Sequence, residues 1–217
     1  MADRFNSDSE TALQEQLCVS RETLERLKIY QALLVQWQQK TNLVAPSTLD
    51  DFWQRHIADS LQCHWLYPEK VRWSDIGTGG GFPGMVIAIA LAENADSNIT
   101  LIDSNQKKCA FLRTVLRETG ARALVVCKRI EQFVAADNGP DIVTARAVAS
   151  LDSLLQLCEP WLMDKTVGLF HKGRDFRQEL QEAHGRWRFD LIEHPSRNSE
   201  DSVILEIARL RQRDTGL

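Results

Sequence analysis

A glycine-rich segment from Asp75 to Gly84, DIGTGGGFPG, constrains the fold of this 217-residue chain more than any other feature. It follows a short apolar run that is typical of a β-strand, and it precedes an apolar stretch that is typical of a helix. Glycines at such a junction let the backbone approach a ligand closely, because they carry no side chain. The segment therefore predicts a ligand-binding loop, including Gly77 and Gly79, at the start of an α/β unit.

The glycine spacing is compatible with two kinds of cofactor. Gly79, Gly81 and Gly84 fit the G-x-G-x-x-G spacing of dinucleotide-binding proteins. Asp75, however, places a carboxylate close to where a pyrophosphate would lie, and two anions repel each other. S-adenosylmethionine has no phosphate, and its sulfonium and amino groups are cations. We expect the loop and Asp75 to bind S-adenosylmethionine, with a dinucleotide or a ligand-free turn as alternatives.

A second acidic residue, Asp103, ends the next apolar run. At this position a carboxylate can accept hydrogen bonds from both ribose hydroxyls of an adenosine. The alternative is that Asp103 caps the helix predicted to begin near Gln106. We favour ribose binding, because its position agrees with that of the glycine loop.

From Val71 onward, short apolar runs alternate with segments of helical length. The runs are residues 71–76, 98–104, 123–128, 141–147 and 167–173, and the helices are expected to begin near Pro83, Gln106, Ile130 and Ser150. This alternation predicts a parallel sheet with helices on both faces. Two later runs, residues 187–195 and 202–210, leave no room for a helix between them and predict an antiparallel hairpin at one edge.

The N-terminal third shows helical periodicity. After Ser20, a good N-cap residue, apolar residues recur at three- or four-residue steps: Leu24, Leu27, Tyr30, Leu34 and Trp37. A further helix is expected from residue 51 to residue 66. We therefore divide the chain into a helical cap, residues 1–66, and a cofactor-binding domain, residues 67–217.

The composition limits the environments and partners of the protein. A net charge of −4 gives no overall attraction to nucleic acid, so an RNA site must be a local patch. The longest apolar stretch, residues 85–92, is far shorter than the roughly 20 residues of a membrane span. Five cysteines are scattered without metal-site spacing. We expect a cytoplasmic protein with no membrane partner and no metal.

Further pairs of residues extend the pattern around the glycine loop. They are Asn42-Leu43, Arg55-His56, Asp59-Ser60-Leu61, Asp103-Ser104, Lys107-Lys108, Phe111-Leu112, Arg129 with Glu131, Arg146-Ala147 and Lys172-Gly173. With these residues the chain resembles, over about residues 40–175, the RsmG family of bacterial RNA methyltransferases, also called glucose-inhibited division protein B. The resemblance implies a Rossmann-like class I methyltransferase fold, with a seven-stranded, mostly parallel sheet, an antiparallel C-terminal hairpin and an N-terminal helical extension.

The resemblance also implies methyl transfer from S-adenosylmethionine to N7 of a guanine in the 530-loop region of small-subunit (16S) ribosomal RNA. It assigns cofactor contacts to Gly77, Phe82, Ile130, Glu131 and Arg146. Glu131 would lie at the adenine, and Phe82 would cover an apolar face. The alternatives are a helix-start carboxylate for Glu131 and a core aromatic for Phe82.

Arg146 is the first candidate for the catalytic residue. It ends the fourth predicted strand, and ligands of open α/β sheets bind at the carboxyl ends of strands. There it would orient the methionine carboxylate or a phosphate, and the alternative is a structural ion pair.

Basic residues on both sides of the loop are candidates for RNA binding. They are Arg55 and His56 in the helical cap, and Lys172 and Arg174 after the fifth strand, and they would contact phosphates rather than read sequence. A solvated or ion-paired surface is the alternative. The expected partner is ribosomal RNA, in a ribosomal particle, and the enzyme is expected to be a monomer.

Three other functions remain open from the sequence. A methyltransferase of the same fold can act on a small molecule or a protein, because fold does not fix substrate. A nicotinamide-dependent oxidoreductase would use the same glycine spacing. A non-catalytic RNA-binding factor would keep the cofactor pocket without turnover.

Overall fold

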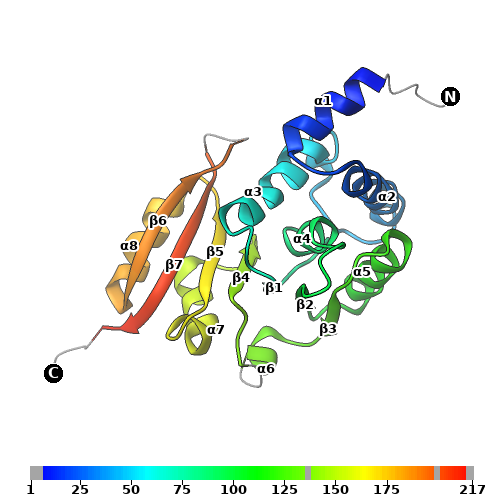
Figure 1. Ribbon diagram of the computed structural model, residues 1–217. Coiled ribbons are helices and arrows are strands. Elements are labelled where there is room, and N and C mark those ends of the chain that lie inside the picture. The colour runs from blue at the N-terminus through cyan, green and yellow to red at the C-terminus, as the bar shows by residue number, and fades with distance from the viewer. Residues whose placement is uncertain (1–6, 135–137, 198–200, 214–217) are drawn as a thin grey trace.

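One mixed sheet forms the centre of the molecule in the computed structural model, which describes residues 7–134, 138–197 and 201–213 (Figure 1). Within these ranges, seven strands lie in the order β3-β2-β1-β4-β5-β7-β6. The strands are β1 (Arg72–Ile76), β2 (Asn98–Asp103), β3 (Leu124–Cys127), β4 (Ile142–Arg146), β5 (Val167–Lys172), β6 (Trp187–Pro195) and β7 (Val203–Gln212).

The direction of the strands agrees with the sequence analysis. Strands β1 to β5 pair in parallel, whereas β7 is antiparallel to both β5 and β6. The predicted seven-stranded sheet with a C-terminal hairpin is confirmed.

Helices cover both faces of this sheet (Figure 1). They are α1 (Ser7–Leu17), α2 (Arg21–Gln38), α3 (Asp59–Leu66), α4 (Gly84–Ala90), α5 (Gln106–Thr119), α6 (Ile130–Val134), α7 (Leu151–Leu162) and α8 (Phe176–Arg186). A 3₁₀-helix, η1 (Pro46–Thr48), and a π-helix, η2 (Phe52–Ala58), connect α2 to α3. No helix in the described part of the chain is long and apolar enough to cross a membrane.

Local sequence explains where several helices begin. The Ser20 side chain accepts a hydrogen bond from the backbone N–H of Thr23 at the start of α2, as predicted. Asn105 caps α5 by accepting from two backbone N–H groups, and Gly120 ends that helix in the left-handed conformation.

Two parts of the helical prediction need correction. Residues 51–66 do not form one continuous α-helix, because the π-helix η2 occupies their first half. A π-helix has wider turns than an α-helix, and apolar residues at four-residue steps do not distinguish the two. Helix α8, between β5 and β6, was not anticipated.

The sheet separates two hydrophobic cores by the alternation of its side chains. Leu101 packs on the face covered by α4 and α5, and the next residue, Ile102, packs on the face covered by α7 and α8. The first core also includes buried residues of the N-terminal helices, such as Leu27 and Leu61. Helix α2 contacts α4 and α5, and α3 contacts α4. The N-terminal segment therefore shares its core with the sheet.

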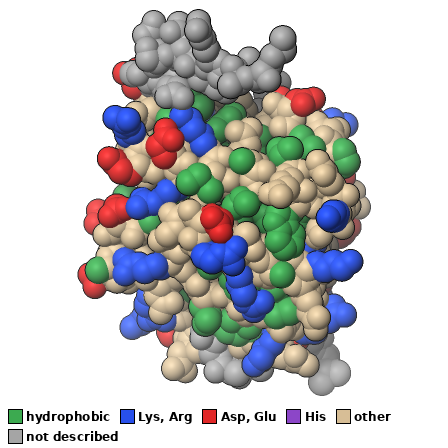
Figure 2. Space-filling model, turned by 90° about the vertical axis from the view of Figure 1, so that its right-hand side faces the viewer, with side chains coloured by type: hydrophobic (Ala, Val, Ile, Leu, Met, Phe, Trp, Pro, Cys, Tyr) green, Lys and Arg blue, Asp and Glu red, His purple; other side chains and the backbone are tan. Residues whose placement is uncertain are grey.

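Charged side chains are mixed on the surface that α2 and α5 form. Figure 2 shows this side of the molecule, with Lys and Arg side chains spread among acidic and hydrophobic ones. The net charge of −4 is thus compatible with local basic areas.

The strand order places the functional region. Strand β1 lies between β2 and β4, so the chain continues to one side after β1 and later to the other. Ligands of open α/β sheets bind at the carboxyl ends of the strands at such a switch point. Gly77, Asp103 and Arg146 all lie at these ends.

Candidate active site

The glycine loop begins at Gly77, whose backbone and surroundings exclude any side chain. Its φ of +63° is in the left-handed region that favours glycine. A Cβ atom added there would lie 2.6 Å from Cγ2 of Val148. Gly77 lines both of the cavities described below, and it therefore forms their junction.

Asp75 lies beneath the loop and lines neither cavity. The residue is only 1% exposed, and its carboxylate accepts hydrogen bonds from the Thr144 hydroxyl (2.7 Å) and the Gly84 backbone N–H (3.0 Å). Burial raises the pKa of Asp75 to about 6, although these hydrogen bonds oppose the shift. The structure thus contradicts the expected direct contact with a cofactor. Asp75 instead connects β1 to β4 and to the start of α4.

A small cavity of about 210 Å³ lies beyond the ends of β2 and β3. Gly77, Asp103, Ser104, Lys128, Arg129, Ile130, Glu131 and Val148 line it. Three of the predicted cofactor contacts, Asp103, Ile130 and Glu131, thus lie together, whereas Val148, which no local motif marks, was not predicted.

Asp103 is positioned by backbone hydrogen bonds. Its Oδ2 accepts from the N–H of Gly79 (2.9 Å), and its Oδ1 accepts from the N–H of Asn105 (2.8 Å). Asn105, not Asp103, is the N-cap of α5, so the capping alternative does not hold. Each carboxylate oxygen can accept a second hydrogen bond, and Asp103 faces the cavity.

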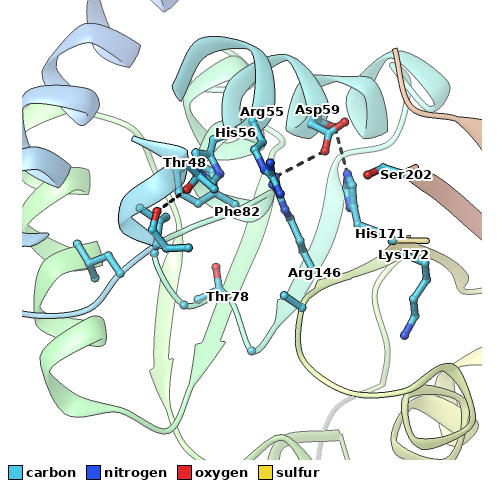
Figure 3. Close-up of a pocket in the computed structure, with 18 of the residues that line it drawn as sticks. Thr48, Arg55, His56, Asp59, Thr78, Phe82, Arg146, His171, Lys172 and Ser202 are labelled. Atoms are coloured by element: carbon cyan, nitrogen blue, oxygen red, sulfur yellow. Dashed lines mark hydrogen bonds and ion pairs between the residues drawn. The ribbon is translucent and has the colours of Figure 1, made fainter. Parts of the chain in front are cut away.

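A larger cavity of about 870 Å³ lies on the other side of Gly77, between the glycine loop, η2 and the ends of β4 and β5 (Figure 3). Phe82 lines this cavity and not the small one. Its ring stacks on His56, with the ring centroids 4.6 Å apart. The expectation that Phe82 covers the adenine beside Glu131 is therefore wrong, because the two residues line different cavities.

His56 is buried and does not share an exposed basic surface with Arg55. Its Nε2 lies 2.8 Å from the Thr48 hydroxyl, whereas the Arg55 side chain is exposed. Burial, followed by the charge of Arg146, lowers the pKa of His56 to about 4. A neutral ring stacked on Phe82 forms a wall of the cavity, so the structure does not support His56 as a phosphate contact.

Arg146 points from the end of β4 into the larger cavity (Figure 3). Its side chain is 18% exposed, and its Nη1 lies 3.8 Å from Oδ2 of Asp59. This Nη1 is buried and has no hydrogen-bond partner among the described residues. A buried donor without a partner costs about 1–3 kcal/mol, and more when it is charged. The site therefore contains a guanidinium that is held ready for an acceptor.

Asp59 and His171 surround this guanidinium. The Asp59 carboxylate accepts a hydrogen bond from the Ser196 hydroxyl (2.7 Å), and its backbone carbonyl lies 3.1 Å from Nε2 of His171. Burial, followed by the charge of Arg146, lowers the pKa of His171 to about 4. Sequence reasoning assigned no role to His171, although its place beside the predicted Lys172 was a signal.

Lys172 and Arg174 are both ion-paired. Lys172 is buried, and its Nζ lies 2.7 Å from Glu179 and donates to the carbonyl oxygen of Ala149. Its predicted role as a phosphate contact is not supported, because the ammonium already has an acceptor and a counter-charge. Arg174 is exposed and pairs with Asp201 at 2.8 Å, so it remains accessible to a partner.

A family model matches most of the chain, including both cavities. The model of the GidB family, described as rRNA small subunit methyltransferase G, matches residues 23–204. The chain belongs to this family. The match includes nearly all of the N-terminal helix α2, both cavities and most of the C-terminal sheet edge up to the start of β7.

Two relatives named ribosomal RNA small subunit methyltransferase G illustrate the similarity. The protein of Rhizobium leguminosarum bv. trifolii (strain WSM2304) is 52% identical over 198 residues, which cover 90% of this chain and 97% of the relative. The protein of Rhizobium meliloti (strain 1021) is 50% identical over 200 residues, which cover 91% and 94%.

Solved structures share the fold at low sequence identity. A putative O-methyltransferase from Klebsiella pneumoniae superposes with a TM-score of 0.58 at 13% identity, covering 93% of this chain and 96% of that one. A mutant of MtNAS in complex with S-adenosylmethionine gives a TM-score of 0.56 at 13% identity, covering 94% and 84%. These likenesses confirm the Rossmann-like methyltransferase fold.

Proposed function

We propose that this protein transfers a methyl group from S-adenosylmethionine to N7 of a guanine in the 530-loop region of 16S ribosomal RNA. The coarser activity, methyl transfer to small-subunit ribosomal RNA, follows from membership of the family. The cofactor and the position of the methyl group are the parts that we propose here. We further propose that the enzyme acts in the cytoplasm, as a monomer, on a ribosomal particle.

The observation that carries this proposal is the pair of cavities joined at Gly77. The small cavity offers a carboxylate, Asp103, and the apolar side chains of Ile130 and Val148, which suit the ribose and the base of an adenosine. The larger cavity offers the guanidinium of Arg146, which is ion-paired with Asp59 and whose Nη1 has no hydrogen-bond partner among the described residues. S-adenosylmethionine fits these two cavities, with its adenosine in the small one and its cationic amino-acid tail toward the larger one. It has no phosphate to place at the narrow junction beside Gly77.

The chemistry of guanine N7 matches what the larger cavity contains. S-adenosylmethionine, when bound, supplies an electrophilic methyl group. Guanine N7 has a free lone pair and no proton to lose, so the protein needs no general base. Burial lowers the pKa of His56 and of His171 to about 4, so both rings are neutral at neutral pH, and the stacked His56 and Phe82 rings form a wall of the cavity. Catalysis at this site is therefore mainly positioning of the two reactants.

Arg146 has the best geometry for orienting the substrate. Its Nη1 has no hydrogen-bond partner among the described residues and lies in the cavity wall, next to the Asp59 carboxylate. We propose that Arg146 donates to an oxygen of the target nucleotide or to the carboxylate of the cofactor. Asp59, beside it, would stabilise the positive charge that the purine gains on methylation.

RNA would approach from the open side of the larger cavity. Arg55 is exposed at its rim on η2, and Lys108 lines it from α5. We propose these two residues, with Arg174, as phosphate contacts. Because each phosphate contact makes binding depend on salt, neutralising Arg55 and Lys108 should reduce the salt dependence of RNA affinity.

The decisive experiment is the transfer of labelled methyl from S-adenosylmethionine to small-subunit particles that lack the modification, followed by digestion to nucleosides. Label in 7-methylguanosine supports the proposal. Cofactor binding without any labelled RNA would contradict the proposed substrate. Label in free nucleotides or in proteins would favour a methyltransferase of another substrate class.

A further inference from the structure

A tyrosine of the N-terminal helical segment reaches the glycine loop from the side opposite the sheet. Tyr30, on α2, is completely buried, and its hydroxyl donates a hydrogen bond of 2.5 Å to the backbone carbonyl of Gly80. The two residues are 50 positions apart in the chain. This contact ties a helix outside the sheet to the centre of the predicted cofactor loop.

The loop backbone fits closely against this tyrosine. Gly81 has a φ of +103°, and a Cβ atom added there would lie 2.7 Å from the Tyr30 hydroxyl oxygen and 2.7 Å from Cβ of Met85. A Cβ added at Gly80 would lie 3.0 Å from the backbone carbonyl oxygen of Leu43. Protein packing therefore explains the glycines at positions 80 and 81, in addition to any ligand.

The Tyr30 ring is itself fixed by other aromatic rings. Its centroid lies 5.4 Å from that of Phe82, 6.0 Å from that of Phe52 and 6.2 Å from that of Phe111. Such ring pairs stabilise the packing beyond the burial of their surface. The hydroxyl therefore has a defined position, and it does not depend on a flexible side chain.

The loop is held from the sheet side as well. Asp103 accepts from the N–H of Gly79, and Asp75 accepts from the N–H of Gly84. Tyr30 supplies the contact at Gly80, between these two points. Three glycines in sequence would otherwise have the largest conformational freedom of any residues in the chain.

We propose that Tyr30 is a positioning residue for the cofactor, which fixes the Gly77–Gly84 loop in its binding conformation without touching the cofactor. This inference rests on the proposed S-adenosylmethionine site. A loop that the protein already holds in order loses less conformational entropy when a ligand binds. Removing the Tyr30 hydroxyl should therefore weaken ligand affinity by about the contribution of one hydrogen bond.

Burial raises the pKa of the Tyr30 hydroxyl well above its ordinary value, so the group stays protonated and donates throughout the working range of pH. The contribution of Tyr30 to cofactor affinity should therefore be constant with pH.

The test uses the full-length variant Tyr30→Phe, with Tyr67→Phe as its matched control. Tyr67 also donates a side-chain hydrogen bond, to Glu206 at 2.7 Å, but it lies at the end of α3 and lines neither cavity. The measurements are the affinity for S-adenosylhomocysteine by calorimetry, and backbone hydrogen exchange of residues 77–84 without ligand. Steady-state kinetics would add the KM for S-adenosylmethionine and kcat.

We expect Tyr30→Phe to weaken S-adenosylhomocysteine binding and raise the KM for S-adenosylmethionine about three- to tenfold, which is the fold-change that corresponds to a hydrogen bond. Exchange in the loop should increase, and kcat at saturating cofactor should change less than about twofold, because the loop is ordered once the cofactor is bound. Tyr67→Phe should leave all of these values as in the wild type.

A folded Tyr30→Phe protein with wild-type affinity and wild-type exchange would overturn the inference. If the wild type itself does not bind S-adenosylhomocysteine, the proposed cofactor fails, whereas the exchange measurement still reports on the loop. The failure of the inference and the failure of the proposed function are therefore distinguishable.

Discussion

At Gly77, a single added carbon should weaken cofactor binding. In Gly77→Ala, the new Cβ would meet Cγ2 of Val148 at 2.6 Å, and alanine would have to adopt a φ of +63°. The left-handed conformation alone costs about 1–2 kcal/mol. We expect cofactor affinity to fall by more than about tenfold, measured by calorimetry with S-adenosylhomocysteine.

A second variant separates the two causes. Gly77→Ala combined with Val148→Ala removes the steric contact and leaves the backbone strain. We expect it to recover part of the affinity. Equal binding by Gly77→Ala and the wild type would show that the junction of the cavities does not hold the cofactor.

Arg146 should affect activity much more than stability. Its buried Nη1 has no hydrogen-bond partner among the described residues, so Arg146→Met replaces a poorly compensated charge by an apolar side chain. We expect single-turnover methylation of ribosomal particles to fall by about a hundredfold, as for other preorganised donors. The melting temperature should change little, because relief of the unpartnered Nη1 offsets the loss of the 3.8 Å ion pair, and Asp59 keeps its hydrogen bond from the Ser196 hydroxyl.

The same pair of measurements can contradict this role. A variant that unfolds easily would identify Arg146 as a structural ion-pair residue of Asp59, and an unchanged single-turnover rate would remove it from the reaction centre. Lys172→Met is the comparison variant, because Lys172 is buried with its counter-charge Glu179 and its loss leaves that carboxylate unpaired. It should be clearly less stable than the wild type.

At the scale of elements, η2 and β5 make the fold sensitive to acid. Each carries a buried histidine, His56 and His171, whose pKa is lowered from 6.5 to about 4. Between these values the unfolded chain binds protons that the folded chain excludes, so stability falls as pH drops from about 6.5 towards 4, by at most about 1.4 kcal/mol per pH unit for each histidine. Asp75, with its pKa raised to about 6, has the opposite sign and offsets part of this loss.

Urea unfolding at several values between about pH 7.5 and pH 5 measures this dependence. The charged groups that face His56 are Arg146 and Arg55, which lower its pKa further, and Asp59, which raises it; burial is the largest cause of the shift. We expect His56→Gln to flatten the pH dependence, and His184→Gln, which changes an exposed histidine, to leave it as in the wild type. A wild-type free energy of unfolding that stays constant down to about pH 5 would refute the assignment of neutral, buried histidines.

The sequence predicted those features that depend only on a short stretch of residues. The strand ends, the glycine loop and the cap at Ser20 depend on short stretches of sequence, and the first two placed Gly77 and Asp103 correctly. The positions of Asp75, Phe82 and His56 depend on which face of the loop or of η2 meets the neighbouring helices. A carboxylate beside glycines therefore suggested a ligand contact, although it is hydrogen-bonded within the protein. Only tertiary packing decides between these possibilities.

At the scale of the whole molecule, the division at residue 66 separates two roles and not two folding units. We propose that residues 1–66 form the RNA-side cap and that residues 67–217 form the methyltransferase domain. One hydrophobic core nevertheless includes Leu27 and Leu61 of the cap together with Ile87 of the domain. Fully burying each such side chain contributes about 1.5–3 kcal/mol, and a domain is stable by only about 5–15 kcal/mol.

The fragment 67–217 should therefore not fold alone. Without the cap, the outer faces of α4 and α5 lose their cover, and the Gly80 carbonyl loses its bond from Tyr30. We expect the fragment to aggregate or to unfold without cooperativity in urea, and we expect co-expression with residues 1–66 as a separate chain to restore a cooperative transition and cofactor binding. A fragment that is monomeric, unfolds cooperatively and binds S-adenosylhomocysteine like the full chain would show that the cap is an independent appendage. Loss of binding in the fragment together with recovery on adding the cap would show that the cofactor site forms only when the helical segment is present.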